Sequence, residues 1–569
     1  AGPEAGPHWT VLKYPDSKID PALVEARLVL CELYQRGLQR GLERLKRVRR
    51  DHADATGRLA GREGNLAESL SRVIASVEQP AGDTGRVDSM TFAGNSARNL
   101  CQPREFAVGA PVWSLPWKER HVEQRLGKSD EWRGDQRSEP RSLQRITRVP
   151  AYFPVTWKNI VFYCDETDIY AISASLGREG QPAWGNEASI FHLPNEVERL
   201  PRAFAQGARV GYPRFTLTVA GDFLFARLGP ATALSSRRRE FRQNGNSLVC
   251  LGLGREGDLQ WRVDSDDLDS EPGQWSFDGA PVVAEGRVFV PVRRGDLQMQ
   301  LHVACFAVAT GRLLWSRKIC GGVEAFGGEA DEIRQQLLTV ADNRLYYNTN
   351  HGAIAALDTT DGRLQWVATY PRVEPETLVG FNRRQRLGPN PCVVAGGQVF
   401  AAPTDCEGIL ALDADSGTLQ WAYRVRGTVP QLLGVAKSRL IAAGDFLWAL
   451  EAETGRIAWR DGQADPEAST WGRGLIAGDQ VFWSRREEIR IVDVATGRPV
   501  RQIDLGLQFG LYGGGNLVQG GDWLFLAQSD RFVAFGEFGG MARPAEKPLA
   551  GIWFPFRPAV EVRPVGEVK

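Results

Sequence analysis

The sequence predicts a mainly β protein: an eight-bladed β-propeller, or one of seven blades, with a small N-terminal α-helical segment. Three observations lead to this fold class. The chain has 569 residues, which is too long for a single hydrophobic core. It therefore forms either several domains or a closed ring of repeated units. Its 62 Gly and 17 Trp are typical of all-β architectures with many turns. A short phrase of sequence also recurs at intervals close to the length of a propeller blade.

The recurring phrase is an apolar strand, an acidic residue, a turn that ends in Gly, and a Trp four residues after that Gly. One copy is Ala356-Leu357-Asp358 with Gly362 and Trp366. The pairs that share this spacing are Gly180 and Trp184, Gly257 and Trp261, Gly311 and Trp315, Gly362 and Trp366, Gly417 and Trp421, and Gly455 and Trp459. In a further copy Gly497 ends the turn and Arg501 stands in the Trp position. The acidic residues of the repeat are Asp358, Asp413, Glu451 and Asp493.

These spacings have a structural reading. Gly takes the positive φ that a tight turn between two antiparallel strands requires. The acidic residue and the Thr or Ser beside the Gly can hydrogen-bond the turn backbone. The Trp on the next strand can pack between neighbouring blades while its N–H donates to a backbone acceptor. The repeat residues are therefore expected to hold the fold together.

A second hairpin of alternating apolar residues precedes each phrase, for example Pro281-Val282-Val283 through Val288-Phe289-Val290. Two hairpins make a four-stranded blade. The last copy, residues 517–535, keeps the strand pattern and lacks the Gly–Trp hairpin. We therefore expect a strand from before the first repeat, around Phe106–Trp113, to complete the last blade and cover its open edge.

Over roughly residues 150–540 the repeated Ala-Leu-Asp-x-x-x-Gly-x-x-x-Trp phrase resembles the tryptophan-docking repeat of quinoprotein dehydrogenases and of BamB-type outer-membrane assembly factors. This resemblance implies a pyrroloquinoline-quinone-like (PQQ-like) β-propeller. It also implies a periplasmic or cell-envelope location in a bacterium. Both enzymes and scaffolds carry this repeat, so the resemblance predicts the fold more directly than the activity.

Residues 1–80 form the N-terminal helical segment. Asp20 before Pro21 is typical of a helix start, and leucines then recur at helical spacing as far as Leu45. A second helix is expected from Asn65 to Val77. The pair resembles the end of a tetratricopeptide-type helical array. Beyond it we expect a polar linker over residues 81–104, the propeller over residues 105–545 and an extended tail over residues 546–569.

Charge and composition exclude several function classes. Lys+Arg and Asp+Glu both total 69, so no long-range field favours nucleic acid. No apolar run is long enough to predict a transmembrane segment. None of the 8 Cys form a Cys-x-x-Cys pair, so zinc ribbons and haem attachment are not supported. Most of these cysteines are expected to be small buried side chains.

An enzymatic reading follows from the resemblance to quinone-dependent dehydrogenases. The resemblance to such enzymes implies an adjacent Cys pair, a calcium ion held by Glu and Asn, and a catalytic Asp. The sequence has no adjacent Cys pair, and no Glu, Asn and Asp set matches that pattern. No cofactor and no catalytic residue is therefore predicted. PQQ with calcium in an atypical dehydrogenase site is the alternative, and a ligand-sensing ectodomain is another.

A basic insertion offers a candidate site for an acidic partner segment. It contains Arg237, Arg238, Arg239 and Arg242, and its plainer interpretation is a solvated loop. The function that these observations favour is a non-catalytic scaffold that binds other proteins in the cell envelope, similar to BamB-type assembly factors.

Overall fold

The structure is a computed structural model that divides into two compact units, one ending at Gly85 and one beginning at Arg86. The described residues are 20–36, 38–59, 62–71, 87–117, 152–175, 177–194, 215–229, 246–268, 275–295, 299–322, 335–372, 390–425, 431–462 and 470–537. No helix among them is long and apolar enough to cross a membrane.

The first unit begins with helix α1 (Pro21–Arg36), where the Asp20 carboxylate accepts a hydrogen bond of 2.9 Å from the Ala22 N–H. This confirms the predicted helix start. The leucine repeat was expected to form one helix, but α1 is followed by a separate helix α2 (Leu38–Asp51) that packs against it.

After α2 come two short strands, β1 (Thr56–Leu59) and β2 (Arg62–Asn65), and a helical stretch over residues 66–71. The apolar faces of the unit meet in one small core. Its buried members are Ala22, Ala26, Val29, Leu45, Val48, Leu66, Ala67 and Leu70.

The second unit is an eight-bladed propeller, which confirms the predicted fold class and the predicted blade number. The first four blades, each from innermost to outermost strand, are β6 (Val155–Trp157), β7 (Ile160–Cys164), β8 (Asp168–Ser173) and β9 (Ser189–His192); β10 (Phe215–Ala220), β11 (Phe223–Leu228), β12 (Ser247–Gly252) and β13 (Asp258–Asp264); β14 (Trp275–Phe277) with β15 (Val282–Ala284), β16 (Arg287–Arg294), β17 (Met299–Ala307) and β18 (Leu313–Gly322); and β19 (Thr339–Ala341), β20 (Arg344–Asn348), β21 (Ala353–Asp358) and β22 (Leu364–Thr369).

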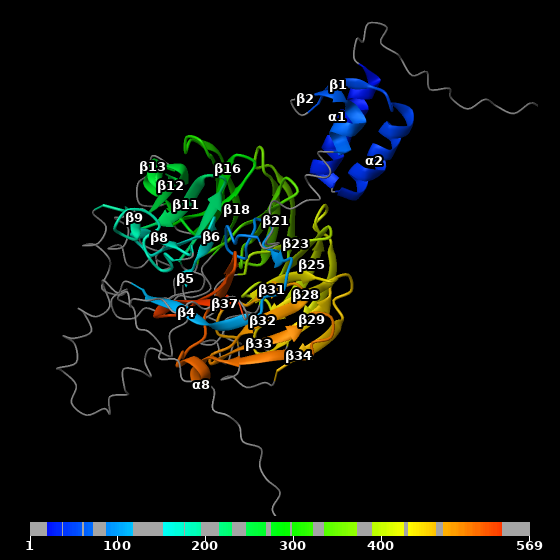
Figure 1. The fold of residues 1–569 in the computed structure, drawn as a ribbon. Helices are drawn as coiled ribbons and strands as arrows, with labels where there is room; N and C mark the ends of the chain where they lie inside the picture. Colours follow the sequence, from blue (N-terminus) through cyan, green and yellow to red (C-terminus); the bar gives the residue numbers. More distant parts are fainter. Residues whose placement is uncertain are drawn as a thin grey trace, which may run out of the picture. The chain divides into compact units, whose positions relative to one another are not determined.

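The remaining blades follow the same order around the ring (Figure 1). They are β23 (Val393–Ala395), β24 (Gln398–Ala401), β25 (Gly408–Asp413) and β26 (Leu419–Arg424); β27 (Gln431–Ala436), β28 (Arg439–Ala443), β29 (Leu447–Glu451) and β30 (Ile457–Asp461); β31 (Leu475–Ala477), β32 (Gln480–Ser484), β33 (Glu488–Asp493) and β34 (Pro499–Asp504); and β35 (Asn516–Gly520), β36 (Trp523–Ala527), β37 (Arg531–Glu537) and β4 (Val108–Pro116). Two short strands, β3 (Cys101–Gln102) and β5 (Tyr152–Phe153), pair with β31 and β10 as fifth strands of those sheets. Other short elements are α8 (Leu505–Phe509) and two 3-10 turns (Leu253–Arg255 and Ser265–Leu268).

Neighbouring blades are joined by a contact between a Trp ring and a Gly turn. A Cβ atom at Gly417 would lie only 2.5 Å from the Trp366 ring, and the φ of Gly417 is +72°. The Trp366 indole N–H also donates to the Ala414 carbonyl at 3.0 Å. Only Gly meets both requirements, since it has no Cβ and adopts positive φ without strain. The same close contact joins Gly311 to Trp261, Gly362 to Trp315, Gly455 to Trp421 and Gly497 to Trp459. The indole N–H groups of Trp261, Trp421 and Trp459 also donate to turn carbonyls, whereas that of Trp315 has no partner among the described residues.

The acidic residues of the repeat hold these turns. The Asp413 carboxylate accepts hydrogen bonds of 2.8 Å from both the N–H and the hydroxyl of Ser416. Asp493 binds Thr496 in the same way at 2.7 Å, and Asp358 accepts from the Thr360 N–H at 2.7 Å. These bonds are the Asx-type turns that the residue types predict.

In the first blade, Trp184 does not make the docking contact that its spacing from Gly180 predicts. Trp184 precedes β9, so it is not on the outer strand, and a Cβ at Gly257 would instead meet Ile190 of β9 at 3.1 Å. Gly180 receives Trp113 of β4, at 3.2 Å. The sequence spacing of Gly180 and Trp184 therefore does not place Trp184 in a docking position.

The last blade is completed by β4, which pairs antiparallel with β37. Figure 1 shows β4, in blue, beside β37, in red-orange. This confirms the strand expected around Phe106–Trp113. Arg501, which stands in the Trp position of the preceding blade, donates to the Val108 carbonyl at 2.7 Å. The ring is thus closed by a strand that comes from the opposite end of the propeller sequence.

The docking contacts should dominate the stability of the ring. We expect Trp366→Ala to lower the free energy of unfolding by about 3 kcal/mol, because it removes a buried indole and leaves a cavity. Trp184→Ala is the matched control, since Trp184 is not in a docking position, and it should cost clearly less. Urea denaturation followed by circular dichroism measures both changes. Equal losses would contradict the assignment of the docking contact as the stabilising one.

Closure by β4 gives a second prediction. The backbone N–H of Trp117 donates to the Asp530 carbonyl at 3.1 Å. Hydrogen-bonded and non-hydrogen-bonded pairs alternate along an antiparallel ladder, so Leu115, which lies opposite Phe532, belongs to the next hydrogen-bonded pair. Leu115→Pro removes that N–H, so we expect it to destabilise the ring by about 1–3 kcal/mol more than Leu115→Ala, which keeps the N–H. Thermal melting of the two variants compares them. Indistinguishable melting temperatures would show that this ladder does not close the ring.

Candidate functional site: a pocket in the central channel

The channel at the centre of the propeller is lined by residues 87–105, which we call the inner segment. Its backbone carbonyls accept hydrogen bonds from the innermost strands of successive blades. Ser89 accepts from Thr156 at 2.9 Å, Met90 from Val219 at 2.7 Å, Ser96 from Val340 at 2.9 Å, Ala97 from Val394 at 3.1 Å and Gln102 from Gly478 at 2.8 Å. The chain therefore runs around the channel wall in the order of the blades.

Side chains and one short strand reinforce this path. The Ser89 hydroxyl donates to the Gln519 carbonyl at 2.8 Å, and the Asn99 amide oxygen accepts from the Val435 N–H at 2.6 Å. Strand β3 (Cys101–Gln102) pairs parallel with β31. An innermost strand has one free edge, and its polar backbone groups need partners once they are buried. The inner segment supplies those partners.

This arrangement corrects the expected linker over residues 81–104. Of that range, residues 87–104 are described, and they lie against the blades. The polar, Gly-containing composition was read as a linker because it shows no strand or helix periodicity. The same composition suits a chain whose backbone bonds to sheet edges.

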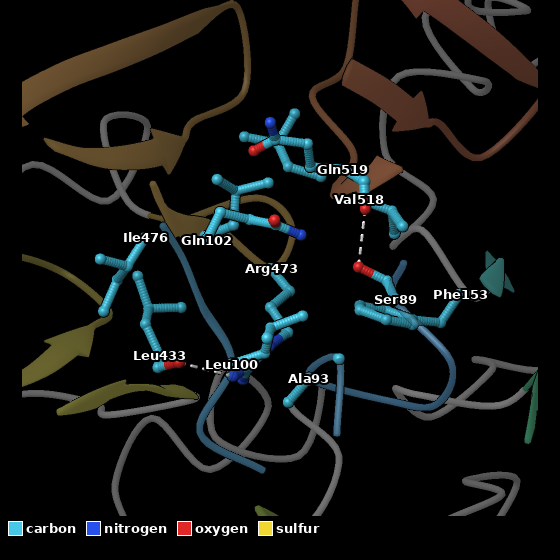
Figure 2. A pocket seen from close by; sticks show the side chains of 14 residues that line it. Ser89, Ala93, Leu100, Gln102, Phe153, Leu433, Arg473, Ile476, Val518 and Gln519 are labelled. Atoms are coloured by element: carbon cyan, nitrogen blue, oxygen red, sulfur yellow. Dashed lines mark hydrogen bonds between the residues drawn. The ribbon is translucent and has the colours of Figure 1, made fainter. Parts of the chain in front are cut away.

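A pocket of about 380 Å³, counted with its opening to solvent, lies between the inner segment and the blades of β27, β31 and β35. Figure 2 shows the Arg473 side chain in the middle of the view, between Gln102 and Ala93, and the hydrogen bond from Ser89 to Gln519 beside it. The lining residues are Ser89, Ala93, Gly94, Leu100, Gln102, Phe153, Leu433, Arg473, Gly474, Leu475, Ile476, Leu517, Val518 and Gln519. The lining is mainly apolar and has a few polar groups, as small-molecule pockets do.

Gln519 is the polar lining residue with unused hydrogen-bonding capacity. Its side chain is 1% exposed, and neither its amide oxygen nor its amide nitrogen has a hydrogen-bond partner within the described ranges. Gln102, by contrast, uses both ends of its amide on Val87. A buried amide without partners costs free energy, so a ligand that satisfies Gln519 is favoured.

Arg473 provides the positive charge of the pocket. It precedes β31, is 3% exposed, and donates from Nη2 to the Leu433 carbonyl at 3.0 Å. Its guanidinium also lies 5.0 Å from the centroid of the Phe92 ring, within cation–π range. These contacts fix the orientation of the side chain.

A second arginine, Arg98 of the inner segment, lies close to Arg473. Arg98 is fully buried, and burial, together with the nearby charge of Arg473, lowers the pKa of Arg98 to about 9. The guanidinium is therefore still protonated at neutral pH. Two buried arginines thus lie near each other, and of the two only Arg473 lines the pocket.

The residues singled out from the sequence lie elsewhere. The Gly and Trp residues of the repeat are at the contacts between outer strands and turns, and none of them lines the pocket. Arg237, Arg238, Arg239 and Arg242 lie outside the described residues, as does the tail over residues 546–569. Sequence reasoning missed Arg473 and Gln519. One signal in the sequence could have indicated the pocket: Gln519 is a polar residue that interrupts the apolar pattern of β35.

The described cysteines and acidic residues form no second centre. The cysteines from Cys101 to Cys406 are free, and burial raises the pKa of Cys250, Cys305 and Cys392 to about 12. They are therefore unreactive thiols. The part of the chain that the structure describes contains no group of three or more His, Cys, Asp and Glu residues that could hold a metal ion.

Comparisons with solved structures agree with the observed architecture. The quinohemoprotein alcohol dehydrogenases of Pseudomonas putida and Comamonas testosteroni superpose with TM-scores of 0.51 and 0.50 at 12% and 14% identity. The first match covers 84% of both chains, and the second covers 85% of this chain and 87% of the other. At such low identity the likeness shows the fold alone.

A curated relative is the dehydrogenase subunit of the quinone alcohol dehydrogenase of Gluconobacter oxydans, which is 27% identical over 203 residues. The match covers 34% of this chain and only 25% of the relative, so this chain spans about a quarter of the length of that protein. The corresponding subunit of Komagataeibacter europaeus is 27% identical over 172 residues, or 29% of this chain and 21% of the relative.

These relatives correct one expectation. The sequence favoured a non-catalytic scaffold for protein–protein contacts, because no adjacent Cys pair and no calcium pattern was found. The curated relatives are dehydrogenase subunits, and this finding contradicts the scaffold interpretation. Absence of one known site pattern was too weak a reason to exclude redox chemistry.

The family itself is shown by a family model described as outer membrane protein assembly factor BamB. It matches residues 246–385 and 372–551, which together are more than half of the chain. The matched region contains the docking turns from Gly257 to Gly497 and the strands around them. The chain therefore belongs to this family of PQQ-like β-propellers.

Proposed function

We propose that this chain takes part in a quinone-dependent redox reaction and binds the quinone in the channel pocket. The names of the curated relatives support the reaction type, since both are dehydrogenase subunits of quinone alcohol dehydrogenases. An alcohol as the electron donor is part of the proposal. So is a periplasmic or cell-envelope location, which is typical of these relatives.

The observation that carries the proposal is the unpartnered amide of Gln519 in the pocket. A primary amide offers N–H donors and a carbonyl acceptor on one side chain. A quinone carbonyl accepts a hydrogen bond, and the hydroxyl of the reduced quinone donates one. Gln519 can therefore bind both oxidation states without changing its own protonation.

The chemistry of the rest of the lining suits an aromatic ring with polar edges. Phe153, Ile476 and Leu517 provide apolar walls, which exclude water and pack on a planar ring. The Arg473 guanidinium donates hydrogen bonds and stabilises negative charge that develops on an oxygen atom during reduction. When bound, the quinone supplies the capacity to accept two electrons.

The calcium ion of the alternative reading does not fit the described pocket. None of its lining residues has a carboxylate, and the described chain has no metal-ligand cluster. Calcium prefers several oxygen ligands with negative charge. We therefore assign no metal to this pocket. The lining also has no imidazole, so we assign the proton of the alcohol to none of these residues.

Binding of PQQ to the purified protein tests this function. We expect calorimetry and difference absorbance to show binding, and Gln519→Leu to weaken it about tenfold or more, because the variant loses two hydrogen bonds. Gln398→Leu is the matched control, since Gln398 is in β24 and does not line the pocket. A dye-linked assay of alcohol oxidation accompanies the binding measurement.

Two outcomes separate the parts of the proposal. Absence of quinone binding would overturn it. Binding that depends on Gln519 without alcohol oxidation would support the quinone site and remove alcohol as the electron donor.

A further inference from the structure

Helix α2 of the N-terminal unit carries exposed positive charge that the proposed redox function does not use. Six of its residues are Arg or Lys, and two are acidic. Leu45 and Val48 are 3% and 1% exposed and pack in the core of the unit. The exposed basic side chains, which we call the basic face, are Lys46, Arg47, Arg49 and Arg50. With about 3.6 residues per turn, these positions lie within roughly half of the helix circumference, on the side away from the core.

Much of this charge is not compensated within the described part of the unit. Arg50 forms an ion pair of 2.8 Å with the carboxylate that follows it in the sequence. Arg49 donates from Nη2 to the Ser71 hydroxyl at 2.8 Å, and this partner is neutral. Lys46 and Arg47 have no ion pair and no side-chain hydrogen bond within the described ranges. These cations are therefore available to an external anion.

The helix dipole explains only part of the arrangement. Cations in the last turn interact favourably with the negative end of a helix, and Arg49 and Arg50 are in that turn. Lys46 and Arg47 lie in the turn before it, where this interaction has faded. Exposed side chains of this kind also contribute little to folding stability. The basic face therefore suits an interaction outside the unit better than a role in folding.

The residue types favour lipid headgroups over nucleic acid as the partner. No aromatic residue stands between Arg44 and Asp51, whereas single-stranded nucleic acid is held by aromatic side chains interleaved with basic ones. Lys+Arg and Asp+Glu both total 69 in the whole chain, so it lacks the basic excess that steers proteins to nucleic acid. The phosphates of an anionic lipid surface need only cations that reach them.

The other side of α2 determines the mode of attachment. A helix that lies in a membrane interface buries its apolar face among the lipid chains. In α2 that face is already covered, because Leu45 and Val48 belong to the same core as Val29 and Leu66. Only the charges remain for contact with a bilayer. Attachment through them is electrostatic, reversible and sensitive to salt.

We propose that the basic face of α2 attaches the N-terminal unit to the surface of an anionic phospholipid bilayer, without insertion of the helix. This goes beyond the quinone function and takes from the section above only the cell-envelope location. Guanidinium and ammonium groups donate hydrogen bonds to phosphate oxygens. Each Lys or Arg near an anionic surface strengthens attachment about fivefold, so several together give measurable binding.

Co-sedimentation of the whole chain with vesicles tests the proposal. One set of vesicles contains equal parts of phosphatidylglycerol and phosphatidylcholine, and the other contains phosphatidylcholine alone. We expect binding to the anionic vesicles to be at least about tenfold tighter at low salt, because several cations meet negative headgroups. Raising the salt concentration should release the protein, since it screens exposed charges.

Charge variants assign the binding to the basic face. The double variant Lys46→Gln and Arg47→Gln should weaken binding to the anionic vesicles about tenfold or more, because it removes two cations. The double variant Lys46→Arg and Arg47→Lys keeps both charges and should bind as the unaltered protein does. The matched control is Arg312→Gln with Arg363→Gln, which removes two exposed cations from the propeller and should leave binding unchanged. Thermal melting checks that each variant folds.

Equal binding to both kinds of vesicle, or equal losses in the two glutamine double variants, would overturn the proposal. Tighter binding to duplex DNA of mixed sequence than to anionic vesicles, at the same salt, would also overturn it and assign the face to nucleic acid. The outcome is separate from that of the quinone function. Loss of vesicle binding with unchanged PQQ binding in the Lys46→Gln and Arg47→Gln variant supports the lipid surface. Charge-dependent vesicle binding by a protein that binds no PQQ also supports it and refutes the quinone function alone.

Discussion

The contact between each docking Trp and the Gly turn of the next blade sets the geometry on which this molecule depends. The indole ring lies so close to the Gly backbone that no Cβ fits between them, as at Trp366 and Gly417. The hydrogen bond from the indole N–H to a carbonyl of the same turn also fixes the angle between the blades. Because these contacts repeat, the innermost strands converge on one axis with their free edges facing the channel.

Those free edges explain the inner segment. Each edge presents backbone groups that need partners, and residues 87–105 accept hydrogen bonds from several of these edges in turn. The pocket lies between this segment and the blades of β27, β31 and β35. A rigid outer ring therefore determines where a cavity can exist. The side chains at its border, Arg473 and Gln519, determine which ligand it favours.

The blades could be predicted from the sequence because their signals are local. A Gly with positive φ and a Trp four residues later lie on one hairpin, and the period repeats. The closing strand could also be predicted, since the last copy lacks an outer strand. Trp184 shows the limit of such spacing. It has the expected distance from Gly180 in the sequence but precedes β9, and Ile190 of β9 contacts Gly257 where a docking Trp was expected.

The pocket could not be predicted in the same way, because its residues are far apart in sequence. Ser89 and Gln519 are 430 positions apart, and the hydrogen bond between them follows from the closed ring alone. The inner segment has no periodicity and was read as a linker. Nothing in the sequence around Arg98 distinguishes it from a surface arginine, and only the structure shows that it is buried. For this reason the pocket and the burial of Arg98 could be found only from the structure.

Ring closure by β4 also has a consequence for synthesis of the protein. Residues 87–116 leave the ribosome before every blade, yet their partners in β35 and β37 are among the last residues of the propeller to be translated. Until then the nascent chain exposes an unpaired strand and the open edges of the early blades. Such late, long-range pairing slows folding and leaves aggregation-prone edges exposed. A truncated chain that stops before β37 would therefore lack its closing partner and be a target for quality control.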